Sequence, residues 1–371
     1  MRTPLVVVLD DPLTRTSETT FRGDSQLTAG LRELLEDPDF APELWCREWI
    51  GTGGHDSEVR SDVTVRYLPR WTRLSILWTV PQLLFAARRL GRRETHLLSV
   101  GPSFSQMALL LMLTRRSNVT WLLRSDPMES LVLTREASNA AVRLAIRAFC
   151  LVWRALIRRQ SDVVCVSAAV AREIGIDAAT IVPEIGWGEL AAASTAPRDR
   201  RNALFVGRLS PEKGPDLAVR AFLGLSEPCA SASLTVVGTG EMESRLRDLA
   251  EPLGDRVTFV GAQSREAVTN LMAEAAVVLV PSLSEGFGLA AFEAAASGAI
   301  VLHSDVGGLN EACGWWRGSV ALPRDDAAAW GKALEESLLG SDAGAPMSTD
   351  AIKAATNWPS LRQVLHERTR V

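Results

Sequence analysis

Cysteine is scarce and scattered in this sequence of 371 residues. No C-x-x-C pair is present, so the sequence predicts neither a disulfide framework nor a zinc site. This usage is typical of a reducing compartment, and we expect a cytoplasmic protein. The five cysteines are Cys46, Cys150, Cys165, Cys229 and Cys313, and those at 150 and 165 lie in apolar runs and are expected to be buried thiols.

Long apolar runs are also missing. The longest uncharged apolar stretch, residues 74–87, is interrupted by Pro81. It falls short of the roughly 20 residues that a membrane-spanning helix needs. The apolar run at residues 5–9 is too short for a secretory signal and is followed by two aspartates. We therefore expect no transmembrane segment.

A large net charge is absent as well. Lys and Arg number 40 against 44 Asp and Glu, which leaves −4 and gives no reason to expect a nucleic-acid partner. Lysine occurs only at Lys213, Lys332 and Lys353. Hydrophobic residues make up 47% and charged residues 23%, which is typical of a globular enzyme, and the length suits two domains.

What is present is a regular alternation of strand-like and helix-like segments. Such alternation predicts parallel sheets with crossover helices. In the first half we expect strands at 5–9, 63–68, 95–100, 119–123 and 162–167, and helices at 26–35, 71–93, 105–114, 140–159 and 168–174. In the second half we expect strands at 203–206, 234–237, 257–260, 277–280 and 300–303, helices at 217–223, 242–249, 265–275 and 289–296, and a helical tail at 358–370.

A low-complexity stretch at residues 191–197 separates the two halves. We therefore expect an α/β protein of two doubly wound, Rossmann-like domains that face each other across a cleft. Ligands of such sheets bind beyond the carboxyl ends of the strands, and a cleft between two domains can bury a ligand. The expected boundaries are 1–185 for the first domain, 186–200 for a linker, 201–345 for the second domain and 346–371 for a final segment.

Two carboxylates, Glu285 and Glu293, stand eight residues apart around the turn Gly286-Phe287-Gly288. An apolar run before the turn reads as a buried strand, and the residues after it read as a helix. The start of that helix presents backbone N–H groups and the positive end of the helix dipole, where a phosphate binds well. Ionised carboxylates accept hydrogen bonds from hydroxyl groups. Phosphate and hydroxyls together indicate a sugar nucleotide.

In this setting residues 285–293 resemble the E-x7-E signature of retaining GT-B glycosyltransferases, specifically glycosyltransferase family 4 (glycosyl transferases group 1). Residues 203–214, 234–240 and 257–261 resemble further segments of the same family, in the same order and spacing. The resemblance is good over residues 200–312 and much weaker before residue 160. It implies a GT-B fold in which the last helix packs back on the first domain.

The resemblance also implies an activity. The chain is expected to move a sugar from a nucleoside diphosphate sugar to an unidentified acceptor, which could be a glycan, a lipid-linked sugar or a small natural product. Retention in this family is usually explained by front-face displacement, in which the leaving phosphate accepts the acceptor's proton. No Asp-x-Asp run stands where a metal-dependent transferase would need one, so we expect no metal and no other cofactor.

The resemblance assigns roles to residues in two loops. Glu285 would bind hydroxyls of the donor sugar and orient its anomeric carbon, and Glu293 would hold the nucleotide ribose. Arg208 and Lys213 would stabilise the charge that develops on the diphosphate. The expected catalytic residues are Glu285, Arg208 and Lys213, and the expected donor contacts are Gly207, Arg208, Lys213, Gly286, Phe287, Gly288, Leu289 and Glu293.

The first half departs from the family in two places. Many relatives have a histidine after the strand at 119–123, where this chain has Arg124-Ser125-Asp126. Arg124 and Asp126 are therefore expected either to contact the acceptor or the donor phosphate, or to form a surface ion pair. Many relatives also have a glycine pair in the loop after the first strand, whereas this chain has Asp10-Asp11-Pro12 and continues to Arg15.

The helix at 140–159 carries arginines along one narrow stripe with apolar residues around it. A core helix with one solvated stripe has this pattern and is the interpretation that we favour. The alternative is peripheral contact with an anionic membrane, at its inner face. The residues of the stripe are Arg143, Arg147, Arg154 and Arg158.

Two other functions stay open. One is a GT-B epimerase or a pseudo-glycosyltransferase that acts on a cyclitol nucleotide. The other is a catalytically degenerate protein that only binds nucleotide sugars. The charged set Arg208, Lys213, Glu285 and Glu293 favours an enzyme over the second of these.

Overall fold

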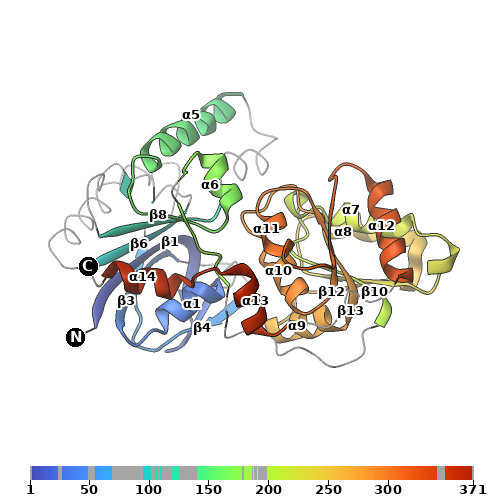
Figure 1. Cartoon of the computed structure of the whole chain (residues 1–371), viewed down its shortest axis with the longest axis horizontal. Helices are drawn as coiled ribbons and strands as arrows, with labels where there is room; N and C mark the ends of the chain where they lie inside the picture. Colours follow the sequence, from blue (N-terminus) through green and yellow to red (C-terminus); the bar gives the residue numbers. More distant parts are fainter. Residues whose placement is uncertain are drawn as a thin grey trace. The chain divides into compact units, whose positions relative to one another are not determined.

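The computed structural model describes residues 2–23, 27–48, 55–68, 95–101, 106, 109–110, 118–125, 140–177, 179–185, 187, 190, 199–340 and 347–369. The chain forms two compact units, one of Met1–Trp187 with Trp358–Val371 and one of Gly188–Asn357 (Figure 1). The helix expected at 71–93, and all but three residues of the one expected at 105–114, lie outside the described residues.

The first unit is built on a parallel sheet with the strand order β5-β3-β1-β6-β7-β8-β9. The strands are β1 (Thr3–Arg15), β3 (Phe40–Arg47), β5 (Thr64–Leu68), β6 (His96–Gly101), β7 (Val119–Leu123), β8 (Val163–Cys165) and β9 (Thr180–Ile181). The described helices are α1 (Ala29–Leu35), α5 (Ala140–Ile157), α6 (Ala168–Ile174) and α14 (Leu361–Thr369).

The loop that we expected at residues 10–15 is a strand, so that prediction was wrong. β1 continues to Arg15 and pairs there with β2 (Thr20–Gly23), which in turn pairs with β4 (His55–Glu58), both in antiparallel fashion. The register of β1 against β3 shifts between Val8 and Pro12. Proline cannot donate to the ladder, so it is tolerated at such an irregularity.

The second unit is built on a wholly parallel sheet with the order β12-β11-β10-β13-β14-β15. Its strands are β10 (Asp199–Val206), β11 (Ser233–Val237), β12 (Val257–Gly261), β13 (Ala275–Val280), β14 (Ile300–Ser304) and β15 (Ser319–Leu322). Its described α-helices are α7 (Pro215–Leu223), α8 (Glu243–Ala250), α9 (Arg265–Glu274), α10 (Leu289–Ala296), α11 (Leu309–Cys313), α12 (Ala327–Leu339) and α13 (Thr349–Thr356). The prediction of two parallel-sheet α/β domains is confirmed.

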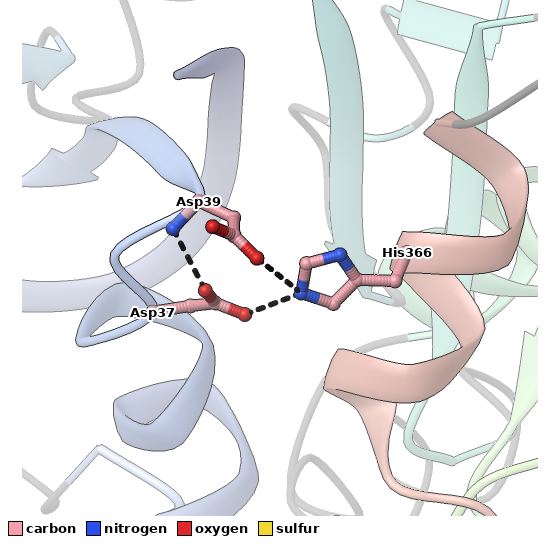
Figure 2. Close-up of side chains that lie close together, drawn as sticks. All are labelled: Asp37, Asp39 and His366. Atoms are coloured by element: carbon pink, nitrogen blue, oxygen red, sulfur yellow. Dashed lines mark hydrogen bonds and ion pairs between the residues drawn. The ribbon is translucent and has the colours of Figure 1, made fainter. Parts of the chain in front are cut away.

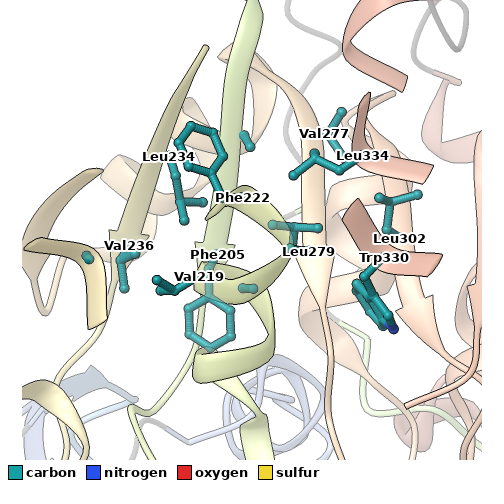
Figure 3. Packing of buried hydrophobic residues seen from close by; sticks show 14 of the residues in the cluster. Phe205, Val219, Phe222, Leu234, Val236, Val277, Leu279, Leu302, Trp330 and Leu334 are labelled. Atoms are coloured by element: carbon teal, nitrogen blue, oxygen red, sulfur yellow. The ribbon is translucent and has the colours of Figure 1, made fainter. Parts of the chain in front are cut away.

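The core of the second unit lies between the sheet and the helices α7 and α12, which contact each other. Phe205 and Leu279 of the sheet meet Phe222 of α7 and Trp330 of α12 in this layer (Figure 3). Trp330 is fully buried, and its indole N–H donates to the carbonyl of Pro323 at 2.8 Å. Close packing of this kind fixes the strands from which the loops of the site emerge.

The first unit is completed by the end of the chain. Asn357 adopts a left-handed conformation (φ 52°) after α13, and the following α14 packs against α1. The buried carboxylate of Asp37 accepts from His366 Nε2 at 2.7 Å, as Figure 2 shows, and pairs with Arg362 Nε at 2.6 Å. At the other end of the helix, Arg368 pairs with Asp162 at 2.7 Å.

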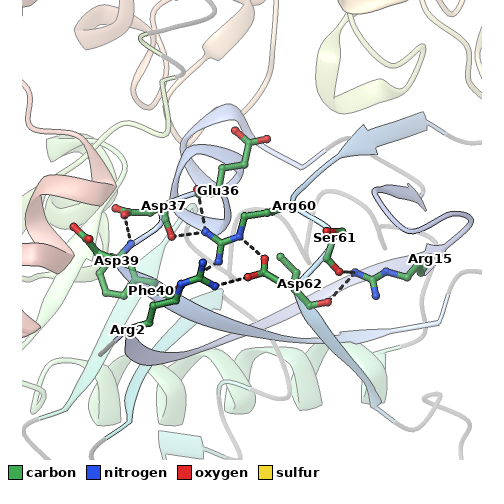
Figure 4. A network of polar contacts seen from close by, with 10 residues as sticks. Arg2, Arg15, Glu36, Asp37, Asp39, Phe40, Arg60, Ser61 and Asp62 are labelled. Carbon is green, nitrogen blue, oxygen red and sulfur yellow. Dashed lines mark hydrogen bonds and ion pairs between the residues drawn. The ribbon is translucent and has the colours of Figure 1, made fainter.

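A wider polar network surrounds the Asp37 end of this contact (Figure 4). The guanidinium of Arg60 donates to the backbone carbonyls of Asp37 and Phe40 and pairs with Asp62. Asp37, Asp39 and His366 are, within the described parts of the chain, the one group with three metal-type ligand atoms close together. The guanidinium of Arg362 already balances the charge of Asp37. We therefore interpret the group as contacts that hold α14 on the first unit rather than as a metal site.

In the parts of the chain that the structure describes, no helix has both the length and the apolar character needed to cross a membrane.

Candidate functional site

The candidate site lies where the strand order of the second sheet reverses. The chain moves outward from β10 through β11 to β12, then returns to β13 beside β10 and moves outward on the other side. The loops after β10 and β13 are neighbours at this switch point, and ligands of such sheets bind in the crevice beyond the carboxyl ends of the strands there. Arg208 and Lys213 lie in the first of these loops, and Glu285 lies in the second.

Backbone contacts hold these loops against their neighbours. Leu209 N–H donates to Thr239 at 2.9 Å, Leu283 N–H donates to Glu212 at 2.8 Å and Gly308 N–H donates to Glu285 at 3.0 Å. A Cβ atom at Gly214 would lie 2.2 Å from the carbonyl oxygen of Pro281, so only glycine fits this approach. The positions of the side chains in the crevice are thus set by packed backbone.

Lys213 and Glu285 meet in this crevice. The ammonium nitrogen of Lys213 lies 2.5 Å from Oε1 of Glu285. The hydroxyl of Ser282, which is buried, donates to the same oxygen at 3.0 Å. The two charged side chains are 26% and 16% exposed, so the pair is largely shielded and still open to a ligand. Sequence reasoning had no signal for Ser282, since its role depends on the shape of the loop.

The start of α10 lies directly after Glu285. Gly288 is in a left-handed conformation (φ 97°), and a Cβ atom there would lie 2.5 Å from the side chain of Leu309. Phe287 is buried, and its ring packs 6.0 Å from that of Phe292. The glycines and the buried ring fix the turn that leads into Leu289, where the helix N-terminus offers backbone N–H groups to an anion.

Two predicted residues form ion pairs with other partners than Lys213 and Glu285. Arg208 is 71% exposed and pairs with Glu212 at 3.1 Å. Glu293 lies in the second turn of α10 and pairs with Arg265 of α9 at 2.9 Å. The sequence analysis did not identify Arg265 as a residue of the site. Its position at the start of a helix could have been recognised, because Ser264 before it is a typical helix N-cap.

His303 is the penultimate residue of β14 and is buried. Its Nδ1 donates to the carbonyl of Ser304 at 3.0 Å, and its Nε2 accepts from the hydroxyl of Ser319 at 2.9 Å. Burial lowers the pKa of this imidazole. His303 is therefore a hydrogen-bonded core residue.

In the first unit, Arg124 follows β7 and forms an ion pair, but with a buried partner. Its Nε and Nη2 contact the two carboxylate oxygens of Glu184 at 2.5 and 2.9 Å, and Thr28 donates to the same carboxylate at 2.7 Å. Glu184 is 4% exposed, so this is a built network rather than a surface pair. Asp126 lies outside the described residues.

Helix α5 buries one face and exposes another. Ile146, Cys150, Trp153 and Ile157 form the buried face. Within the helix, Arg147 is exposed and Arg154 is half-buried, and Arg158, the residue after its end, is exposed. Three large apolar side chains share the outer side, and these are Leu144, Leu151 and Val152, which are 69%, 62% and 51% exposed.

Comparison with known proteins gives a family match for the second half of the chain. Residues 189–358 match the model of the family Glycosyl transferases group 1. D-inositol 3-phosphate glycosyltransferases are similar over part of the chain. That of Mycobacteroides abscessus is 38% identical over 44% of this chain, and that of Salinispora tropica is 34% identical over 50%. The matched segments span 37% and 42% of those relatives, well under two thirds of their length.

Solved structures match over the full length. The sucrose-phosphate synthase of Thermosynechococcus elongatus covers 100% of this chain and 98% of its own, with a TM-score of 0.67 at 20% identity. HepE of Anabaena in complex with UDP covers 98% of both chains, with a TM-score of 0.65 at 15% identity. The lipopolysaccharide glycosyltransferase WaaG has a TM-score of 0.63 at 15% identity. The chain therefore has the GT-B fold.

Proposed function

We propose that this protein is a retaining glycosyltransferase of family 4 type that uses a nucleoside diphosphate sugar as donor. The observation that carries the proposal is the Lys213–Glu285 pair, held at the switch point of the second sheet and directly before the N-terminus of α10. A cation, a carboxylate and a helix N-terminus at one point suit a phosphate on one side and sugar hydroxyls on the other. The group 1 match over residues 189–358 supports the same function.

The proposed roles follow from the positions of the side chains. The diphosphate would lie at the start of α10, against the backbone N–H groups of Phe287, Gly288 and Leu289, with Lys213 beside it. Glu285 would accept hydrogen bonds from hydroxyls of the donor sugar. Arg208, which is largely exposed, would reach the diphosphate from the loop after β10. Gly207 in that loop and Gly286 in the loop after β13 would let the backbone come close.

The proposed reaction is a front-face displacement. A hydroxyl oxygen of the acceptor forms a bond to the anomeric carbon on the face from which the nucleoside diphosphate leaves. The bond between that carbon and the diphosphate oxygen breaks, and this oxygen takes the proton of the acceptor hydroxyl. Negative charge grows on the diphosphate in the transition state, where fixed cations and N–H groups stabilise it most. The buried His303 has no part in this proton transfer.

The first test is donor turnover with and without a chelator. Because Lys213, Arg208 and the start of α10 supply positive charge, we expect the protein to hydrolyse one member of a UDP-, GDP- and ADP-sugar panel slowly without an acceptor. The rate should be unchanged by EDTA, and proton NMR should show that the sugar anomer first released has the configuration of the donor. Loss of activity with EDTA and rescue by Mn²⁺ or Mg²⁺ would contradict the metal-independent mechanism.

The same experiment separates the alternatives. A GT-B epimerase would change the configuration of the donor sugar and leave it attached to the diphosphate, and a pseudo-glycosyltransferase would need a cyclitol nucleotide. A degenerate binding protein would bind a nucleotide sugar without turnover. Release of free sugar from the donor argues against all three.

We also propose that the outer side of α5 makes a peripheral contact with an anionic membrane. Leu144, Leu151 and Val152 can enter the headgroup region, while Arg147 can contact lipid phosphates. No acidic residue occurs between residues 140 and 161, so nothing within the helix opposes an anionic surface. The sugar acceptor could then be soluble or lipid-linked.

A further inference from the structure

The ion pair between Arg265 and Glu293 connects two helices beside the proposed donor site. Nη2 of Arg265 lies 2.9 Å from Oε1 of Glu293, and the side chains are 33% and 29% exposed. Both residues line a pocket between α9 and α10, together with Thr269, Met272 and Ser297. The pair is therefore half-shielded and open on one side to a ligand.

Helix stability does not account for an arginine at this place. Arg265 is the first residue of α9, after Ser264, whose hydroxyl caps the helix by accepting from Ala267 N–H. A cation in the first turn faces the positive end of the helix dipole, which is unfavourable. Glu266, the next residue, has the charge that this turn prefers. The arginine is held at this position by its contact with Glu293 on the neighbouring helix.

A carboxylate can serve both the arginine and a ligand. It has two oxygens with about four acceptor sites, so one arginine N–H and the two cis hydroxyls of a ribose can be accommodated together. A charged donor also restricts the rotamers of the carboxylate, which reduces the ordering cost when the ligand binds. Arg265 and the ribose would thus act on Glu293 together rather than compete for it.

We propose that Arg265 is a positioning residue for the nucleoside end of the donor. It holds the Glu293 carboxylate toward the ribose hydroxyls and contributes to the preference for a ribonucleotide over a 2′-deoxyribonucleotide. The inference rests on the proposed function, because it needs a nucleoside diphosphate sugar as donor and takes Glu293 as the ribose ligand that the family resemblance implies. It goes beyond that function in assigning Arg265, which acts through Glu293 and does not touch the reacting atoms.

The test is isothermal titration with UDP, GDP and ADP, followed by the 2′-deoxy form of whichever binds most tightly. We expect Arg265→Ala to weaken binding of that ribonucleotide by about three- to tenfold, in the range of couplings between contacting residues. Binding of the 2′-deoxynucleotide and of inorganic pyrophosphate should change less than twofold. Arg265→Lys, which keeps the charge, should recover part of the loss.

A double-mutant cycle decides whether Arg265 acts through Glu293. In a Glu293→Gln background, Arg265→Ala should cause no further loss. The matched control is Arg247→Ala, which breaks another Arg–Glu pair of the same unit, with Glu243 at 2.8 Å, and should leave every affinity unchanged. Equal losses for ribo- and deoxyribonucleotide, or additive losses in the cycle, would overturn the inference while the proposed function stands. If the wild-type protein binds none of the three nucleotides, the proposed function itself fails.

Discussion

At the scale of single residues, each of the two glutamates has its own cation. Glu285, in the loop before α10, pairs with Lys213 of the loop after β10. Glu293, within α10, pairs with Arg265 of α9. Glu293 is the fifth residue of α10, so it lies more than one helical turn beyond the start of the helix. A donor that places its diphosphate at the helix start would put its sugar near the first glutamate and its nucleoside near the second.

This separation predicts different defects for two isosteric substitutions. Glu285→Gln removes negative charge beside the developing oxocarbenium ion, so it should lower turnover more than donor affinity. Glu293→Gln should mainly weaken nucleoside diphosphate binding, by about 1.5–3 kcal/mol for a lost charged hydrogen bond. Steady-state kinetics and titration with the diphosphate distinguish the two.

The matched control for these variants is Glu243→Gln on α8, which also removes a carboxylate that is paired with an arginine. It should leave turnover and affinity unchanged. If Glu285→Gln and Glu293→Gln both behave like this control, the assignment of the site is wrong, and the glycosyltransferase proposal falls with it.

At the scale of elements, the loops at the carboxyl ends of the strands work as one assembly. A Cβ atom at Gly307 would lie 1.9 Å from the carbonyl oxygen of Glu285, and one at Gly238 would lie 1.9 Å from that of Gly207. Both glycines have positive φ, which other residues rarely adopt. The loops after β10, β11, β13 and β14 therefore fix one another, which keeps Lys213 and Glu285 in place.

Helix α5 gives a separate prediction. If its outer side contacts an anionic membrane, the protein should co-sediment with vesicles that contain phosphatidylglycerol at low salt and less so at high salt, and not with neutral vesicles. Leu144→Ser combined with Leu151→Ser should reduce the bound fraction several-fold. Leu339→Ser, at another exposed leucine of 55% exposure, is the control. Equal recovery in the supernatant under all conditions would remove the membrane proposal.

At the scale of the whole molecule, the first unit is discontinuous in sequence. It needs α14, which returns to it after the second unit, and Asp37 is the buried anchor for that helix. Burial would raise the pKa of Asp37, but hydrogen bonds from Asp39 N–H and His366, with the charge of Arg362, outweigh it and hold the pKa below its usual value. The ionised carboxylate therefore stabilises the folded state.

Asp37→Asn should lower the free energy of unfolding of the first unit at neutral pH. We expect about 1–2 kcal/mol, a modest figure because Arg362 is half exposed and screened by solvent. A carboxyl group with a depressed pKa contributes above its unfolded value near 4 and loses this contribution as the pH falls further. The difference between the wild type and the variant should thus shrink below about pH 4.

Urea denaturation at several pH values measures this difference. Asp39→Asn is the control, because that carboxylate is 67% exposed and only 3.8 Å from His366, while its backbone N–H still donates to Asp37. A difference for Asp37→Asn that is absent at neutral pH, or that grows as the pH falls through 4, would show that Asp37 does not anchor α14 as an ion.

The sequence by itself determined many of the strands and helices and the two loops of the site. Apolar periodicity is a local property, so β7, α6 and α10 were predicted at their observed bounds. In both loops of the site a glycine stands next to a charged residue after an apolar strand, and this pattern identified the loops that contain Arg208 and Glu285. The strand β3 was not predicted, since Pro42 interrupts its pattern and proline is disfavoured inside a sheet.

Only the tertiary structure decided which charges meet. Lys213 and Glu285 are 72 residues apart, Arg265 and Glu293 are 28 apart, and Asp37 and His366 are 329 apart. Each pairing depends on which strands or helices are neighbours, and no local pattern encodes this. Strand order places the loops after β10 and β13 side by side, and that order follows from packing the whole sheet under its helices.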